Sequence, residues 1–309
     1  MTLNYTPKHQ FIEKSVVEDV ITNENKSMKD ILKPYRAVVR IEDTFKGTTS
    51  TSYMESVLSY FENVMATDVT LIEINLSIQQ MNELMASNNR LMLFSSAEVP
   101  LQSFRNILRF ETEDLPEMSF DRIIIDWNNL TENREVTVLL LNTTNGTLYR
   151  TSIGNQGENR VFTTLVEPTK NFYIYTEIKR ANSLSLYTDV NPVEAVKYMY
   201  LSQNIPVEKF EKILFPDQDI VQLSVLSATT NRYNDIMSFM TVDTKNFILN
   251  YVYRPSEGLA YIAPSELLDE SFSFINKHGG YNADYRLSLI NKDKHIVDYQ
   301  LYYHGLPVF

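Results

Sequence analysis

Three apolar runs around an Asn-Gly turn constrain the fold of this chain more than any other feature. The runs are "FDRIIIDW" at 120–127, "EVTVLLLN" at 135–142 and "TLYRTSI" at 147–153, and the turn is Asn145-Gly146. Runs of this length, rich in β-branched and aromatic residues, predict strands, and Asn-Gly favours a tight hairpin because both residues tolerate positive φ. The pattern therefore predicts an antiparallel meander.

Four other segments place apolar residues at helical spacing, at 54–65, 78–85, 207–214 and 267–275. A run of alternating residues at 34–41 predicts a first strand, and further strand-like runs lie at 69–74, 90–94, 220–226, 236–242, 246–253 and 284–303. Helices and strands alternate without the long, regular crossovers that a doubly wound parallel sheet requires. The sequence predicts an α+β protein, with two mixed, largely antiparallel sheet domains and amphipathic helices packed on them.

The domain limits follow from length and local composition. The chain has 309 residues and 43% hydrophobic content, which is enough for two cores. Charged and small polar residues interrupt the strand pattern in "KRANSLS" at 179–185. We predict a polar N-terminal lead at 1–33, a first α+β domain at 34–180 and a second at 181–309.

Charge and cysteine content exclude several classes of protein. The formal charge is -11, which disfavours binding to nucleic acid or to an anionic leaflet. The chain has no cysteine, and therefore no disulfide, thiolate nucleophile or cysteine-bound zinc. No window approaches the ~18 apolar residues that a membrane-spanning helix needs.

The segment "FINKHGGYNADYRL" at 274–287 is the strongest candidate for a site. In one interpretation it ends a helix and begins a strand, because a glycine at positive φ commonly follows a helix and cations favour its last turn. The residues of this structural motif are His278, Gly279, Gly280, Asp284 and Arg286. In the alternative, His278, Asp284 and Arg286 line the pocket of a ligand-binding or hydrolytic domain.

Alternation along "DYRLSLI" predicts that Tyr285, Leu287 and Leu289 share one face of a strand. The other histidines are His9, His295 and His304, and none has the spacing of a metal site. The acidic runs "ETEDLPEM" and "FPDQD" lack the glycine and the closing glutamate of a calcium loop. Trp127 is either a buried anchor or an exposed partner contact.

Nucleotide-binding and serine-hydrolase motifs are also absent from the sequence. It has no GxSxG, GxGxxG or P-loop, and only 8 glycines. We therefore predict no catalytic residues, no metal and no cofactor.

Four blocks, taken in order, resemble the signature of the YycH (WalH) family. They are "FDRIIID", "VEKFEKILFPDQDIV", "FSFINKHGGYNADYRL" and "YYHGLPVF", and the resemblance covers residues 34–309. It implies a non-enzymatic regulator of the YycFG (WalKR) two-component system, which controls cell-wall metabolism in Gram-positive bacteria.

The resemblance also implies partners and a location. Such a protein acts with YycI on the sensor histidine kinase YycG (WalK), usually restraining it, from the extracytoplasmic face of the cell membrane. It touches the membrane only through a single N-terminal helix, which we expect before residue 1, and a further C-terminal domain is expected after residue 309. The contact residues stay unknown at this stage.

Overall fold

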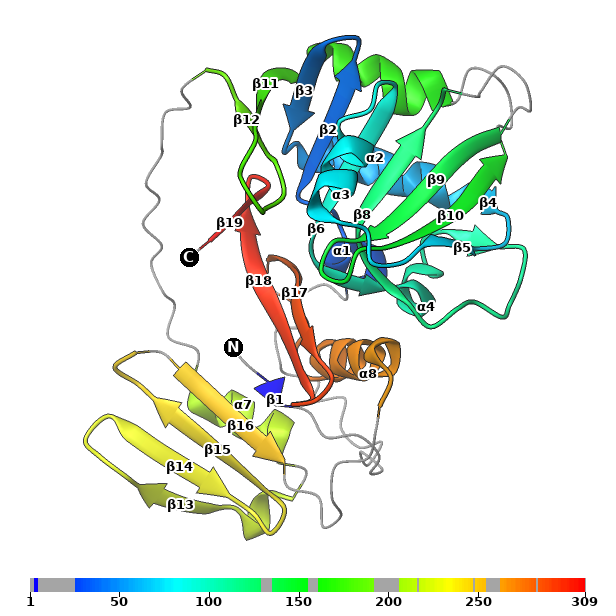
Figure 1. Ribbon diagram of the computed structural model, residues 1–309. Coiled ribbons are helices and arrows are strands. Elements are labelled where there is room, and N and C mark those ends of the chain that lie inside the picture. The colour runs from blue at the N-terminus through cyan, green and yellow to red at the C-terminus, as the bar shows by residue number, and fades with distance from the viewer. Residues whose placement is uncertain are drawn as a thin grey trace. The chain divides into compact units, whose positions relative to one another are not determined.

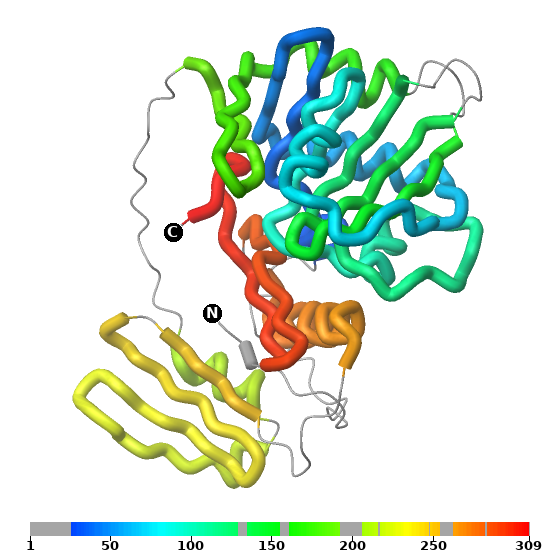
Figure 2. Tube along the Cα trace, in the orientation of Figure 1, coloured from blue at the N-terminus to red at the C-terminus, as the bar shows by residue number. Residues whose placement is uncertain are grey.

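A computed structural model of the chain is shown in Figures 1 and 2. It describes residues 3–4, 26–128, 135–154, 161–191, 206–215, 217–246, 248–253, 262–281 and 283–308. The chain divides into two compact units, Met1–Ser27 with Val196–Leu301, and Met28–Ala195 with Tyr302–Phe309. Both contain sheets with helices, which confirms the predicted α+β class.

The Met28–Ala195 unit contains an 11-stranded sheet in the order β12-β11-β3-β2-β6-β8-β9-β10-β4-β7, with β5 also paired to β10. The strands are β2 (Arg36–Ile41), β3 (Thr44–Thr48), β4 (Met65–Ala66), β5 (Thr70–Glu73), β6 (Arg90–Pro100), β7 (Arg109–Phe110), β8 (Ser119–Asp126), β9 (Glu135–Asn142), β10 (Thr147–Gly154), β11 (Tyr173–Ile178) and β12 (Leu186–Asp189). Among the described strands of this sheet, only β4 and β7 pair in parallel.

The predicted meander is present as β8, β9 and β10, which pair antiparallel along their length. Its last turn has four residues, 143–146, because Asn142 pairs with Thr147. The Asn142 side chain accepts hydrogen bonds from the backbone N–H groups of Thr144 and Asn145, and Gly146 adopts φ +67°. A Cβ on Gly146 would lie 2.5 Å from the Leu76 carbonyl oxygen, so this turn requires glycine.

Helices cover both faces of this sheet (Figure 1). They are α1 (Met28–Ile31), α2 (Thr51–Glu62), α3 (Ile78–Met85), α4 (Leu101–Phe104), the π-helical turn η1 (Phe162–Val166) and the 3-10 turn η2 (Glu167–Asn171). A Ser50 side chain caps α2, and Ser77 and Gln80 form a capping box on α3. The predicted helix at 78–85 is thus present, and the one predicted at 54–65 is present as α2 but ends at Glu62, so that Val64 lies outside it and Met65 belongs to β4.

The central strands are buried on both sides. One face packs Met81 and Met85 of α3 against a cluster that includes Met92, Ile124 and Leu141. The intervening residues are buried as well: Leu91, Leu93, Ile123, Ile125 and Leu140 are at most 1% exposed. Burial on both faces explains the continuous apolar runs, and it corrects the alternation expected at 34–41, where Ala37, Val38 and Val39 are all buried.

The end of the predicted polar lead is structured. Residues 28–31 form α1, where Met28 and Ile31 are buried. Lys33 is 6% exposed, and its Nζ lies 2.7 Å from Glu55 Oε1 on α2. The compact unit begins at Met28, while the predicted domain limits of 34–180 and 181–309 stay predictions.

Five described residues of this unit other than glycine have positive φ: Glu42, Asn75, Asn89, Asn182 and His304. The β2–β3 hairpin has a two-residue loop, since Ile41 pairs with Thr44, and Glu42 at its first position has φ +53°. Asn89, just before β6, has φ +56°. Glycine is the usual residue at the first position of a type II′ turn, because a Cβ is strained there.

The other unit contains α7 (Val207–Leu214), the 3-10 turn η3 (Gln218–Ile220) and α8 (Pro264–Lys277). Its sheet runs β13 (Gln222–Val225), β14 (Thr230–Asn234), β15 (Ser238–Asp243), β16 (Ile248–Tyr253), β1 (Leu3–Asn4), β18 (Ile296–Tyr303) and β17 (Asp284–Asn291). The short β19 (Leu306–Pro307) pairs with Tyr302 and Tyr303 at the end of β18, and these residues belong to the Met28–Ala195 unit. A core of Leu214, Phe215, Met240, Val242 and Tyr251 lies between α7 and the β14–β16 strands.

Core and surface leucines of one sheet give the first test. Leu93 is fully buried and Leu71 is 54% exposed, both in the Met28–Ala195 unit. We expect Leu93→Ala to lower the free energy of unfolding by about 2–5 kcal/mol, and the control Leu71→Ala to lower it by less than about 1 kcal/mol. Urea unfolding followed by Trp127 fluorescence measures this, because the single tryptophan is buried in the same unit. Equal losses in the two variants would contradict the assignment of the core.

Candidate functional site

The sequence motif at 278–280 lies at the end of α8. His278 is the C-cap residue, and its backbone N–H donates to the carbonyls of Phe274 and Ile275 at 3.1 Å. Gly279 and Gly280 follow at φ +114° and +68°, and the Gly280 N–H donates to Ile275 O at 2.8 Å. A φ of +114° is strained for any residue with a Cβ. The glycine pair therefore reverses the chain and satisfies the last carbonyls of the helix.

The His278 side chain is held by the helix that it ends. Its ring stacks on Phe274 with centroids 4.1 Å apart, and Nδ1 lies 2.7 Å from Phe274 O. Burial lowers the pKa of His278, the carbonyl contact opposes this, and the Lys277 charge adds to the lowering. A neutral ring that donates from Nδ1 fits this geometry. The described contacts give Nε2 no hydroxyl or carboxylate partner, so no nucleophile is activated here.

Asp284 and Arg286 are brought together on β17. The guanidinium contacts both carboxylate oxygens, with Nη2–Oδ2 at 2.7 Å and Nε–Oδ1 at 3.2 Å. The Arg286 side chain is 1% exposed and that of Asp284 is 30% exposed. Burying an arginine requires a partner for its charge, and the two-oxygen contact supplies one. The contacts of the His278 ring are instead with Phe274 on α8.

The predicted strand at 285–289 lies within β17, so that Tyr285, Leu287 and Leu289 share one face, but this face is not uniformly buried. Leu287 is buried, Tyr285 is partly buried and Leu289 is 44% exposed, so one leucine of the apolar row faces solvent. The opposite row carries the buried Arg286. Sequence alternation could not reveal this, because an arginine in a strand is normally read as the exposed face.

A cluster of aromatic rings beside this motif was missed by the sequence analysis. Tyr281 lies 5.4 Å from Tyr299 and 6.1 Å from Phe272 between ring centroids, and Tyr299 donates to Ser271 Oγ at 3.2 Å. Burial raises the pKa of Tyr299 to about 12 and also raises the pKa of Tyr281. Both phenols stay protonated near neutral pH. The alternating aromatic residues on either side of "HGG" were the available signal.

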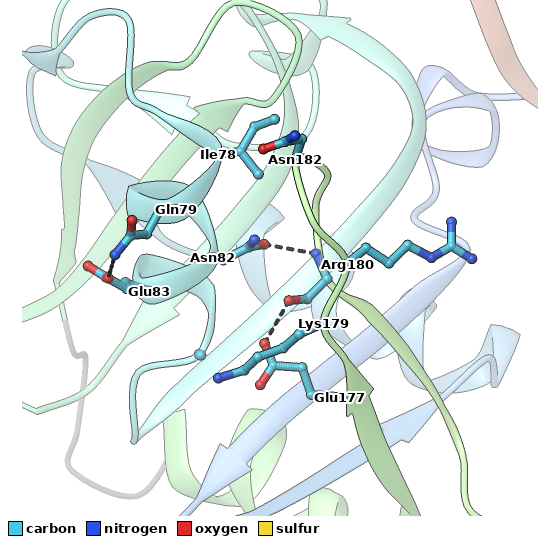
Figure 3. Close-up of a pocket in the computed structure, with 10 residues that line it drawn as sticks. Ile78, Gln79, Asn82, Glu83, Glu177, Lys179, Arg180 and Asn182 are labelled. Carbon is cyan, nitrogen blue, oxygen red and sulfur yellow. Dashed lines mark hydrogen bonds between the residues drawn. The ribbon is translucent and has the colours of Figure 1, made fainter.

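The described cavity lies in the other unit, between α3 and the β11–β12 hairpin (Figure 3). Its volume is about 420 Å³, and it is lined by Ile78, Gln79, Asn82, Glu83, Ala86, Glu177, Lys179, Arg180, Asn182 and Ser185. The three residues proposed for a pocket in the sequence, His278, Asp284 and Arg286, are not among them. Local sequence patterns carry no sign of this cavity, because its two walls are about 100 residues apart in the chain.

Hydrogen bonds fix the wall of the cavity. Asn82 Oδ1 accepts from Ser185 N at 2.8 Å, and Asn82 Nδ2 donates to Ser183 O at 3.2 Å. Ser185 Oγ donates to Glu177 Oε1 at 2.7 Å, and Gln79 donates to Glu83. The polar groups are largely paired with one another, which ties the hairpin to α3 (Figure 3). The lining carries charges of both signs, from Glu83, Glu177, Lys179 and Arg180.

The remaining candidates have structural positions. His295 is 5% exposed at φ +51° in the β17–β18 turn, and His304 has φ +50° in the turn before β19. His9 lies outside the described residues. Trp127 is 8% exposed, which favours the buried anchor. Within the described ranges no three histidine, aspartate or glutamate side chains gather in a way that could hold a metal ion.

Two protein-family models match this chain. The family model described as "YycH protein, N-terminal domain" matches residues 1–168, and "YycH protein, C-terminal domain" matches residues 183–309. The chain belongs to the YycH family, a family of regulators that are not known as enzymes. The predicted resemblance is therefore confirmed.

A solved structure agrees with this assignment. The crystal structure of YycH from Bacillus subtilis superposes with a TM-score of 0.77 at 14% sequence identity, over 94% of this chain and 75% of that one. At this identity the match shows the shared fold. No curated protein matches the chain. Within the described residues, no helix has the length and hydropathy to cross a membrane.

Titration of His278 gives the second test. Because burial favours the neutral ring, we expect its pKa to lie below the usual value of about 6.5. Above about pH 6.5 the neutral His278 ring contributes fully to the stability of the folded state. This contribution is lost as the pH falls from about 6.5 through the lowered pKa of the folded state. A proton NMR titration measures it, with the signal assigned by its loss in His278→Phe, which keeps a ring against Phe274. A pKa above 6.5 would contradict the stacked, neutral ring.

The ion pair gives the third test. We expect Asp284→Ala to destabilise β17 by about 1–3 kcal/mol, because the buried Arg286 loses a charged partner. The partial exposure of Asp284 keeps the cost at the lower end. Hydrogen exchange of peptides from 284–303 measures this as protection reduced about 5- to 150-fold. Asp293→Ala, in the exposed turn after β17, is the matched control, and equal effects in the two variants would refute the role of the pair.

Proposed function

We propose that this chain is a non-catalytic extracytoplasmic regulator that binds the sensor histidine kinase YycG (WalK) together with YycI and restrains its signalling. The observation that carries the proposal is the match of two YycH domain models to 1–168 and 183–309. Control of cell-wall metabolism in Gram-positive bacteria then follows as the physiological role. The kinase and YycI enter the proposal through the resemblance to this family.

The structural positions of the residues in the 278–286 motif support a binding role. Its histidine and glycines end α8, and its aspartate and arginine form an ion pair on β17. None of these contacts presents an activated nucleophile or a paired acid and base to solvent. The alternative, a hydrolytic or ligand-binding pocket near His278, has no supporting contact among the described residues.

Restraint of a kinase by binding has a simple energetic form. A regulator shifts a two-state kinase only by binding one state more tightly than the other, and each tenfold preference corresponds to about 1.4 kcal/mol. Two units that bind different surfaces would add to this preference without any chemistry. The chain itself needs only complementary surfaces.

Attachment to the membrane completes the proposal. In the full-length protein, the N-terminal helix implied by the family places the domains beside the kinase. The net charge of -11 keeps the folded domains from lying on an anionic leaflet. Contacts with proteins, rather than with lipid, are then what orients them.

Co-purification is the test of this function. We expect the full-length protein, co-expressed with YycG and YycI in membranes, to be retained with both partners after detergent extraction. Removal of the membrane helix should reduce retention. When two contacts are linked in one chain, formation of the first raises the effective concentration for formation of the second. His278→Phe should leave retention and kinase autophosphorylation unchanged. Absence of both partners from the full-length sample would overturn the proposal, and turnover of a wall-derived compound that is lost in His278→Phe would favour the enzymatic alternative.

A further inference from the structure

Among the described strands, β13 is an edge strand of its sheet. It lies at one end of the strand order and, among the described strands, pairs only with β14 (Figure 1). The segment 220–230, "IVQLSVLSATT", contains no charged residue and no proline. Proteins normally protect an exposed edge with a charge, a proline or a covering loop, because free strand edges recruit other strands. This edge has none of these within the strand.

The free backbone groups of β13 follow from its register. Gln222 pairs with Asn234 and Ser224 with Arg232, and Leu226 continues the register by donating its N–H to Thr230 O at 2.9 Å. Alternate residues of an antiparallel strand bond to the same neighbour. The N–H and C=O groups of Leu223 and Val225 therefore point away from β14, toward the open edge.

The side chains of these two residues are also uncovered. Leu223 is 58% exposed and Val225 is 72% exposed. Leu223 lies opposite Tyr233, which in turn lies opposite the buried Met240, so the row continues the apolar face under α7. The apolar row of this sheet extends beyond the helix that covers it.

We propose that β13 pairs antiparallel with β13 of a second copy of this chain, about a twofold axis at Ser224. In this register Leu223 lies opposite Val225 of the second copy, and Val225 opposite its Leu223. All four outward groups of each strand are then hydrogen-bonded, and apolar side chains meet on the α7 face. The two sheets become one.

Charge favours a second copy as the occupant. In this register Asp219 lies opposite Thr229 of the second copy, and Ser224 lies opposite its own counterpart. Like charges directly opposite each other would destabilise the pair, and the uncharged segment 220–230 avoids them. The strand is thus complementary to itself without requiring any basic residue from a partner.

The expected association is weak. Stable interfaces bury about 1,200–2,000 Å² in total, and a strand of four residues buries less. We therefore expect a dissociation constant above about 1 µM. Disulfide cross-linking therefore detects such a dimer better than a measurement of molecular size does.

Single cysteines test the register, since the natural chain has none. In Ser224→Cys the two thiols occupy a non-hydrogen-bonded pair with Cα atoms about 4.5 Å apart, within the disulfide range of about 4.4–6.8 Å. In Gln222→Cys alone the thiols are four residues out of register, about 14 Å apart. We expect mild oxidation to link Ser224→Cys into dimers, neither Gln222→Cys nor Leu226→Cys alone to do so, and an equimolar mixture of these two to cross-link.

A charged side chain at the edge of β13 should prevent the two strands from pairing. Adding Val225→Lys to Ser224→Cys should slow the cross-link at least about tenfold, and because Val225 is exposed the circular dichroism spectrum should stay unchanged. Cross-linking of Ser224→Cys no faster than that of Asp293→Cys, a thiol in another exposed turn, would overturn the proposal. So would a Ser224→Cys chain that in cells links to a different protein instead of itself. These results are independent of kinase binding.

Discussion

Burial of the β6, β8 and β9 strands on both faces is the constraint on which the larger unit depends. The side chains on both faces of these strands are buried, so neither face can be left uncovered without exposing a row of leucines and isoleucines to water. Helix α3 covers one row, and the apolar side of α2 is itself buried. The position of α3 in turn fixes one wall of the cavity, and the β11–β12 hairpin that forms the other wall is attached through Asn82 and Ser185.

The sequence predicted those features whose signals are local. The meander, the helices at α2, α3, α7 and α8, and the glycine stop after α8 each depend on a few neighbouring residues. Features that depend on distant contacts were not predictable: the ion pairs that hold α1 on α2, the buried Arg286 and the cavity all join residues whose partners the chain order does not reveal. The prediction of alternating burial was also wrong where a strand is buried on both faces, because apolar residues then occupy consecutive positions.

The motif that identifies the family and the surface that would perform its function are different parts of the molecule. His278, Gly279 and Gly280 end a helix, and Asp284 and Arg286 are held together in a strand. Such residues serve the backbone and the strand core, so a resemblance built on them reports the fold. A regulator that works by contact has its specificity in exposed segments, where sequence patterns carry little information. This division explains how the family is readable from the sequence while the contact residues are not.

Two of the turn residues at positive φ, Glu42 and Asn89, have one further consequence. Each holds a Cβ in a backbone region that favours glycine, at a cost of the order of 1 kcal/mol. Neither position belongs to β13 or to the walls of the cavity. The chain therefore has room to gain thermal tolerance at these two bends while β13 and the cavity are left as they are.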